Sequence, residues 1–198
     1  MSKAILSHHK KSVALIKWAT LLLVPMTLAL WLEPINTTVF LWLNARLVDW
    51  FGATFWALLT NLGDGFFLFP LGMILVRHNP NKQQALIIAM IFAALALNIN
   101  KHYIDAIRPL GILGEALVTV VGPEVESLSM PSGHSGTVFI LAGLALLFAN
   151  KQTALLIVSL SILAGLSRIA VGAHFPADIC AGAWIGLLCT ALATVVSA

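Results

Sequence analysis

The chain has 198 residues, of which 60% are hydrophobic and 10% are charged, and its mean hydropathy is +0.96. Soluble domains carry about 25% charged residues, so this composition excludes an ordinary soluble fold and predicts an all-α integral membrane protein. The net charge of +3 is small and follows from membrane topology, so it gives no reason to expect a nucleic-acid partner.

Six apolar stretches, several of them shorter than the roughly 20 residues that cross a bilayer, predict six transmembrane helices. Linkers rich in Pro, Gly or Ser do not divide the chain, so residues 1–198 are expected to form one domain. In chain order the predicted spans cover residues 13–32, 64–76 with an upstream extension over 51–62, 83–99, 136–149, 153–171 and 179–196.

The first two segments each allow a second interpretation. Residues 13–32 follow a basic N-terminus, as in a secretory signal, but the apolar run is as long as a full span, so we expect a retained helix. Residues 36–50 carry Trp42, Trp50, Arg46 and Asp49 among aliphatic side chains. They predict an interfacial helix, and the start of a long second span is the open alternative.

Charge placement orients the chain, because basic residues favour the cytoplasmic side. A cytoplasmic N-terminus, and with six spans a cytoplasmic C-terminus, puts all eight acidic residues on the other side, together with Arg46, Lys101, Arg108 and Arg168. We therefore expect an inner-membrane protein whose functional face is periplasmic or extracellular. The seven basic residues left at the cytoplasmic face are Lys3, Lys10, Lys11, Lys17, Arg77, Lys82 and Lys151.

Three short motifs in the second half fall at the outer ends of predicted spans. Ionisable residues at such positions are costly unless they are used, so their convergence at one membrane depth predicts a functional site. The motifs are Lys101-x6-Arg108-Pro109, Pro131-Ser132-Gly133-His134, and Ser167-Arg168-x5-His174-x3-Asp178.

The residue types in these motifs suit phosphoryl transfer. Three cations can neutralise the charge that spreads over the oxygens of a phosphoryl group in its transition state. Ser132 offers a hydroxyl, and Gly133 lets the backbone approach an anion at the start of a helix. The spacing of His174 and Asp178 can bring the carboxylate to the imidazole, which predicts His174 as nucleophile and His134 as general acid.

The three motifs resemble the signature of the type-2 phosphatidic acid phosphatase superfamily, which includes membrane lipid phosphatases and vanadium haloperoxidases. Every signature position is matched at the family spacing. The resemblance implies that Lys101, Arg108 and Arg168 bind phosphate with help from Ser132 and Gly133. It also implies a phosphohistidine on His174, support from Asp178, a leaving group protonated by His134, and no metal or other cofactor.

A membrane lipid phosphate or pyrophosphate is the substrate that this combination predicts, with undecaprenyl pyrophosphate as the first choice by resemblance to small bacterial members. Phosphatidylglycerol phosphate, phosphatidic acid and lipid A phosphates remain open. Two other functions stay open: a lipid phosphotransferase that uses the same residues, and, more remotely, an anion transporter. Asp64 is expected to cap a helix, and the alternative is that it lines the site.

Overall fold

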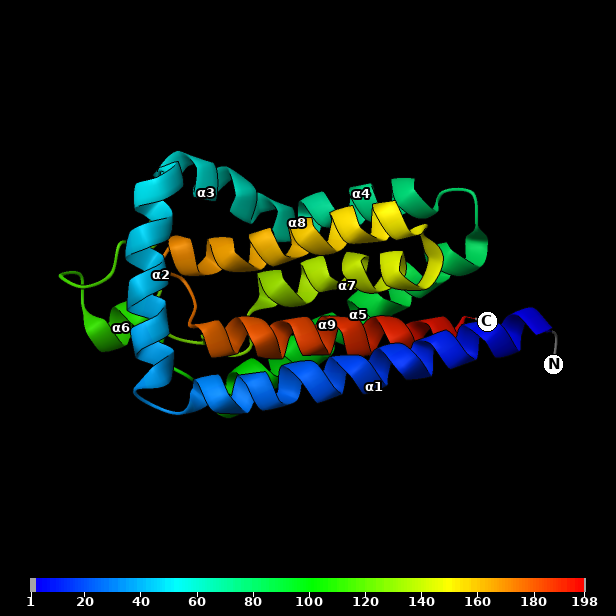
Figure 1. Cartoon of the computed structure of the whole chain (residues 1–198), viewed down its shortest axis with the longest axis horizontal. Helices are drawn as coiled ribbons and strands as arrows, with labels where there is room; N and C mark the ends of the chain where they lie inside the picture. Colours follow the sequence, from blue (N-terminus) through cyan, green and yellow to red (C-terminus); the bar gives the residue numbers. More distant parts are fainter. Residues whose placement is uncertain (1–2, 198) are drawn as a thin grey trace.

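The computed structural model describes residues 3–197, which form a helical bundle with one long loop at residues 114–132 (Figure 1). Chain order is α1 (Lys3–Trp31), α2 (Ile35–Phe51), α3 (Ala53–Thr60), the 3₁₀ turn η1 (Asn61–Gly63), α4 (Gly65–Val76), α5 (Pro80–Ile104), α6 (Pro109–Leu113), α7 (Gly133–Phe148), α8 (Lys151–Ala170) and α9 (Pro176–Val196).

The prediction of six spans is met in part. Within residues 3–197, four helical segments are long and apolar enough to cross a membrane, and a fifth span results if α3–η1 and α4 count as one span bent by 60°. Helix α7 has 16 residues, fewer than the roughly 20 that cross a hydrocarbon core at right angles. A sixth crossing by α7 therefore stays a prediction.

Helix α9 lies at the centre of the bundle and packs against α1, α5 and α7. Small residues allow its close approach to α7: a Cβ atom on Gly182 would collide with the Ser132 carbonyl oxygen, and one on Gly186 with that of Gly136. Close approach through small residues is the usual way membrane helices gain packing energy. It presses the start of α7 directly against the first turns of α9.

Helix α2 crosses one end of the bundle, whereas both chain ends lie at the opposite end (Figure 1). Two buried asparagines attach α2 to the bundle. Asn44 donates to the carbonyl oxygens of Thr119, Ile169 and Ala170, and Asn36 accepts from the Ala177 N–H at 3.2 Å. This arrangement favours the interfacial interpretation of α2 over the start of a long span.

Side-chain caps fix the starts of the helices that carry the motifs. Ser132 caps α7, Asn150 caps α8, and Asp178 accepts from the Phe175 N–H at the start of α9, where Pro176 occupies the first helical position. Asp64 caps α4 by accepting from the Phe66 N–H at 2.8 Å, as the sequence predicts. The motif side chains therefore stand at defined helix ends.

Candidate active site

The three motifs meet at the end of the bundle that α2 crosses. Lys101 lies in the last turn of α5 and Arg108 caps α6, while Ser132, Gly133 and His134 begin α7. Hydrogen bonds to backbone oxygens join these segments: the Ser132 backbone N–H donates to the Asp178 carbonyl oxygen at 2.9 Å, and the Arg108 side chain donates through Nη1 to the Ala173 carbonyl oxygen at 3.3 Å.

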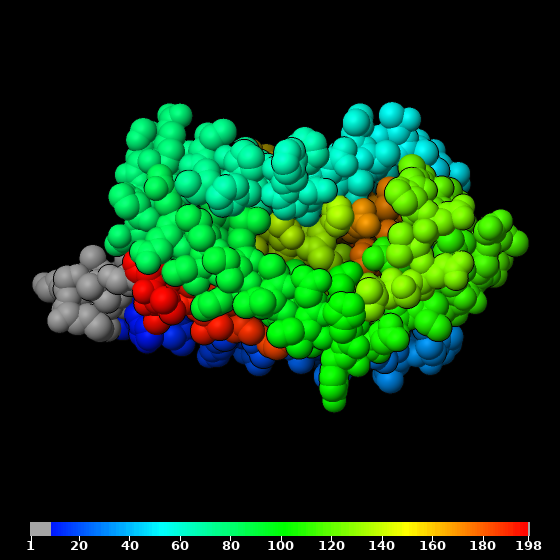
Figure 2. All heavy atoms as spheres, turned by 180° about the vertical axis from the view of Figure 1, so that it is seen from behind, coloured from blue at the N-terminus to red at the C-terminus, as the bar shows by residue number. Residues whose placement is uncertain are grey.

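A cavity of about 520 Å³ lies among these segments, and Arg108, His134 and Arg168 line it. Residues 57–64 form one wall, and the loop at 120–125 forms another. Figure 2 shows a hollow between these walls, with yellow-green atoms from the region of the α7 start and orange atoms from the region of the α8 end at its floor. The loop wall is apolar, whereas the wall at residues 57–64 contributes Thr60, Asn61 and Asp64, and this mixed lining suits a charged head group on an apolar molecule.

The other five predicted residues do not line this cavity but adjoin it. Lys101 interacts electrostatically with Arg108, Arg168 and Asp178. The backbone N–H of His174 donates to the Arg168 carbonyl oxygen at 3.2 Å, so the backbone at His174 is tied to the turn that ends α8. Ser132 is fully buried and accepts from the Ser135 N–H at 3.4 Å, so its hydroxyl caps the helix. Gly133 has open space where a Cβ would be.

His174 is 2% exposed, and its Nδ1 atom lies 3.5 Å from Oδ2 of Asp178. That distance is too long for a formed hydrogen bond, and Nδ1 has no hydrogen-bond partner among the described residues. Burial lowers the pKa of His174 to about 3, an effect strengthened by Arg168 and Arg108 and opposed by Asp178. The imidazole is therefore neutral near pH 7, as a nucleophile requires.

Each cation is held by one or two protein oxygens, which leaves other donors for a ligand. Lys101 Nζ donates to the Leu128 carbonyl oxygen at 2.9 Å, and Arg108 Nε donates to that of Ser127 at 2.8 Å. Arg168 Nη1 donates to Oγ1 of Thr60 at 2.6 Å, while its buried Nε has no partner among the described residues. An anion in the cavity would satisfy such a donor.

Three residues that the motifs do not contain hold the site together. Ser129 is fully buried and donates to Oδ2 of Asp178 at 2.6 Å, and Thr60 holds Arg168 from α3. Asn44 is 1% exposed and binds the loop at Thr119 and the end of α8. For Asn44 the sequence offered a signal, a polar residue in an apolar helix. Ser129 and Thr60 sit in stretches where serine and threonine are unremarkable.

Asp64 fulfils both interpretations that the sequence allowed. Besides capping α4, it lines the cavity and interacts electrostatically with His134. The neighbouring Gly63 packs against the same histidine, because a Cβ there would lie 2.8 Å from the His134 Cβ. Among the described residues, no group of three or more His, Cys, Asp or Glu side chains could hold a metal ion.

Comparison with known proteins gives consistent matches. The model of the PAP2 superfamily matches residues 84–198, which include all three motifs. Two relatives are each named lipid A 1-phosphatase. The one from Rhizobium johnstonii is 31% identical over 159 residues, 72% of this chain and 64% of the relative. The one from Rhizobium etli is 32% identical over 157 residues, 66% of this chain and 67% of the relative.

Two solved structures share the fold. LpxE from Aquifex aeolicus has a TM-score of 0.71 and 28% identity, over 80% of this chain and 94% of that chain. The PAP2-type phosphatidylglycerolphosphate phosphatase from Bacillus subtilis has a TM-score of 0.68 over 92% of this chain and 94% of that chain, and at 22% identity it supports the fold alone. With the family model covering more than half of its residues and every signature position present, this chain belongs to the PAP2 superfamily.

Proposed function

We propose that this protein is a lipid phosphatase that removes a phosphoryl group from a lipid in the membrane. The observation that carries this proposal is the cavity that Arg108, Arg168 and His134 line, together with the neutral His174 next to it. The names of the relatives, lipid A 1-phosphatase, support the same class of reaction.

The reaction would take two steps. In the first, Nε2 of His174 attacks phosphorus, a P–N bond forms, the P–O bond to the lipid breaks, and His134 gives its proton to the departing oxygen. In the second, His134 takes a proton from a water molecule whose oxygen attacks phosphorus. The P–N bond breaks, and inorganic phosphate leaves. Lys101, Arg108 and Arg168 stabilise the charge on the phosphoryl oxygens in both steps.

The placement of the site relative to the membrane is part of the proposal. The basic residues of the N-terminal segment and of the connections near residues 77–82 and 151 favour a cytoplasmic N-terminus. Both chain ends lie at the end of the bundle opposite α2 (Figure 1). The cavity would then open at the periplasmic or extracellular face. Single cysteines at Glu115 and Asn79 test this placement, because an impermeant thiol reagent should label only the first in intact cells. Labelling of Asn79 alone would reverse the orientation.

For the substrate, the names of the relatives support a lipid A phosphate, while undecaprenyl pyrophosphate stays a prediction from sequence resemblance. The test is phosphate release by purified full-length protein from a panel of both lipids, phosphatidylglycerol phosphate and phosphatidic acid. The assay includes a chelator, because the proposed mechanism uses no metal. Release from at least one lipid that stops in His174→Ala supports the proposal. Transfer to a second lipid without phosphate release would instead establish a phosphotransferase, and an absence of both products would refute the proposal.

A further inference from the structure

A second hollow lies on the membrane-facing side of the bundle. It is a groove of about 580 Å³ between α1 and α8, with α7 and α9 as its floor. The floor is recessed because it carries small residues, among them Ala142 and Ala183. Its rim is open to the side: Trp18, Leu22 and Ile162 are 65%, 66% and 49% exposed. The groove therefore faces the lipid, and hydrocarbon must fill it for its walls to keep their packing contacts.

The two ends of this groove differ. At the end near the active site, Val39 and Leu43 of α2 close it, and α2 is seen crossing the bundle there (Figure 1). The opposite end, at Leu15 and Val158, has no such crossing helix. A hydrocarbon chain that occupies the groove must therefore belong to a lipid whose polar head group lies at the end opposite the catalytic cavity.

One lysine extends each wall at that open end. On α1, Lys11 precedes the lining residues Leu15, Trp18 and Leu22 at spacings of 4, 7 and 11, which keeps it on the same helix face. On α8, Lys151 precedes Val158 and Ile162 at spacings of 7 and 11. Both lysines are exposed. Two cations thus flank the mouth of an apolar groove, which is complementary to one anionic head group with a hydrocarbon chain.

We infer that this groove and its two lysines form a binding site for an anionic phospholipid of the leaflet opposite the catalytic cavity. Its phosphate lies between Lys11 and Lys151, and one acyl chain lies in the groove. The two exposed lysines at its open end favour a lipid with an anionic head group over an apolar helix of a second copy, which would leave both cations without a partner charge.

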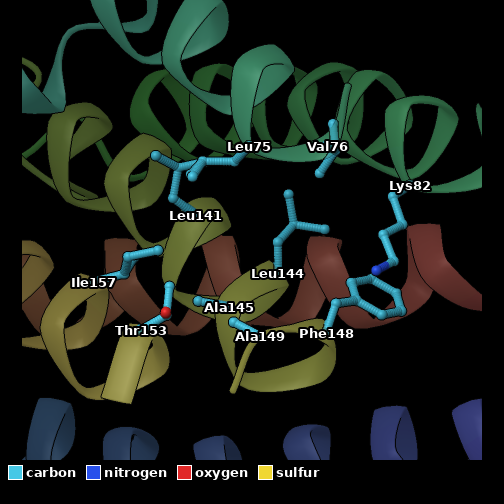
Figure 3. Close-up of a pocket in the computed structure, with 10 residues that line it drawn as sticks. All are labelled: Leu75, Val76, Lys82, Leu141, Leu144, Ala145, Phe148, Ala149, Thr153 and Ile157. Carbon is cyan, nitrogen blue, oxygen red and sulfur yellow. The ribbon is translucent and has the colours of Figure 1, made fainter. Parts of the chain in front are cut away.

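A nearby hollow shows what a less suitable site looks like. A cavity of about 130 Å³ is lined by Lys82, Phe148 and Leu144 (Figure 3). Here the Lys82 side chain lies over the Phe148 ring, with Nζ 4.8 Å from the ring centroid. This cavity is small, and its lysine already lies over an aromatic ring. Lys11 and Lys151 instead both lie at the open end of a larger groove.

The head-group part of the inference is tested by native mass spectrometry of the full chain released from nanodiscs. The discs hold equal amounts of phosphatidylglycerol and phosphatidylcholine with identical chains. We expect one retained phosphatidylglycerol per protein, and we expect Lys11→Gln and Lys151→Gln each to weaken its retention relative to phosphatidylcholine about fivefold. The matched control is Lys10→Gln, an exposed neighbour on another face of α1, which should change retention less than about twofold.

The acyl-chain part is tested by narrowing the groove. Leu22→Trp adds bulk to its rim, whereas Leu21→Trp adds the same bulk to a position of α1 that is 57% exposed and outside the groove. We expect Leu22→Trp to lower retention roughly threefold and Leu21→Trp to leave it unchanged. Competition by glycerol phosphate, which has no chains, should fail, and this arm separates a lipid site from a phosphate site.

Three results would overturn the inference. They are equal retention of the two lipids, effects of Lys11→Gln and Lys151→Gln no larger than that of Lys10→Gln, or a groove occupied by a second copy in a lipid-independent dimer. The substituted lysines are exposed and lie at the opposite end of the bundle from the cavity, so phosphate release by the three lysine variants should match that of the unaltered chain. That control verifies folding and keeps this inference separate from the proposed phosphatase activity.

Discussion

The end of the bundle that holds the cavity and the body of the bundle are stabilised by different interactions. At the end that holds the cavity, buried polar groups are tied by directed hydrogen bonds, such as Ser129 to Asp178 and Thr60 to Arg168. Along the body of the bundle, α7 and α9 are matched by shape, through Gly136, Gly182 and Gly186. Substitutions at the polar end should therefore reduce turnover while the fold persists, and those in the body should reduce stability first.

The largest expected effect is that of removing the proposed nucleophile. His174→Ala should lower phosphate release by at least about 10⁴-fold and abolish an acid-labile phosphoenzyme, because no P–N bond can form. Rapid-quench trapping and phosphate assays measure both, and circular dichroism checks that the helices persist. The control is His102→Ala at an exposed position. Near-normal turnover in His174→Ala would contradict the proposed mechanism and the expectation that substitutions at the polar end reduce turnover.

Arg168→Ala should come next. Its buried Nε lacks a hydrogen-bond partner in the part of the chain that the structure describes, so the loss of this side chain should affect the ligand more than the fold. We expect turnover to fall about 10²–10³-fold, as for the loss of a transition-state donor. Inhibition by vanadate, which mimics the five-coordinate phosphorus, should weaken in parallel. Inhibition constants for both proteins measure this, and an unchanged vanadate affinity would contradict the assignment of Arg168 to the phosphoryl oxygens.

Acid should destabilise the polar end through His174. Its pKa is about 3 in the folded protein against about 6.5 when exposed, so the unfolded chain binds the extra proton between these values. The stabilisation is complete above about pH 6.5 and is lost as pH falls toward 3, by up to about 1.4 kcal/mol per pH unit. Denaturant unfolding from pH 7 to 4 should show a steeper fall than in His174→Gln. If the unfolding free energies of the two proteins fell equally with pH, the pKa of His174 in the folded protein would lie close to that of an exposed histidine.

In the body of the bundle, Gly182→Ala should cost about 1–3 kcal/mol of unfolding free energy, because its Cβ would collide with the Ser132 carbonyl oxygen and one backbone must move. Unfolding in detergent measures this loss. Leu192→Ala, on the exposed side of the same helix, should cost less. If Gly182→Ala lowered turnover but left the unfolding free energy unchanged, the contact between α7 and α9 at Gly182 would position the site rather than stabilise the fold.

The smallest effect should be that of Ser129→Ala, which removes one donor from Asp178. A hydrogen bond to a charged group is worth about 1.5 kcal/mol, so we expect about tenfold slower turnover, a displaced pH profile and little change in KM. Ser129→Thr keeps the hydroxyl and should restore most of the activity. A loss that threonine fails to restore would point to packing at this fully buried position.

The sequence carried much of this picture because motif spacing and apolar length are local properties. It placed the eight motif residues at one end of the bundle and predicted the Asp64 cap. It missed the bend at residues 61–64 and the approach of Thr60 to Arg168, since both depend on how α3 packs against α8. It also started the fourth span at residue 136, whereas the Ser132 cap begins α7 at Gly133. The predicted bond between His174 and Asp178 is a 3.5 Å approach, because Ser129 and the Phe175 N–H occupy the same carboxylate oxygen.

The crossing of α7 and α9 also limits how the chain can change in length. Ser132 meets α9 at two points: its N–H binds the Asp178 carbonyl oxygen, and its own carbonyl oxygen lies against Gly182 one turn later. Inserting one residue between Asp178 and Gly182 would rotate the rest of α9 by about 100° relative to its first turn. The glycines would then leave the contact and side chains would replace them. Insertions and deletions should therefore not be tolerated within these few residues of α9.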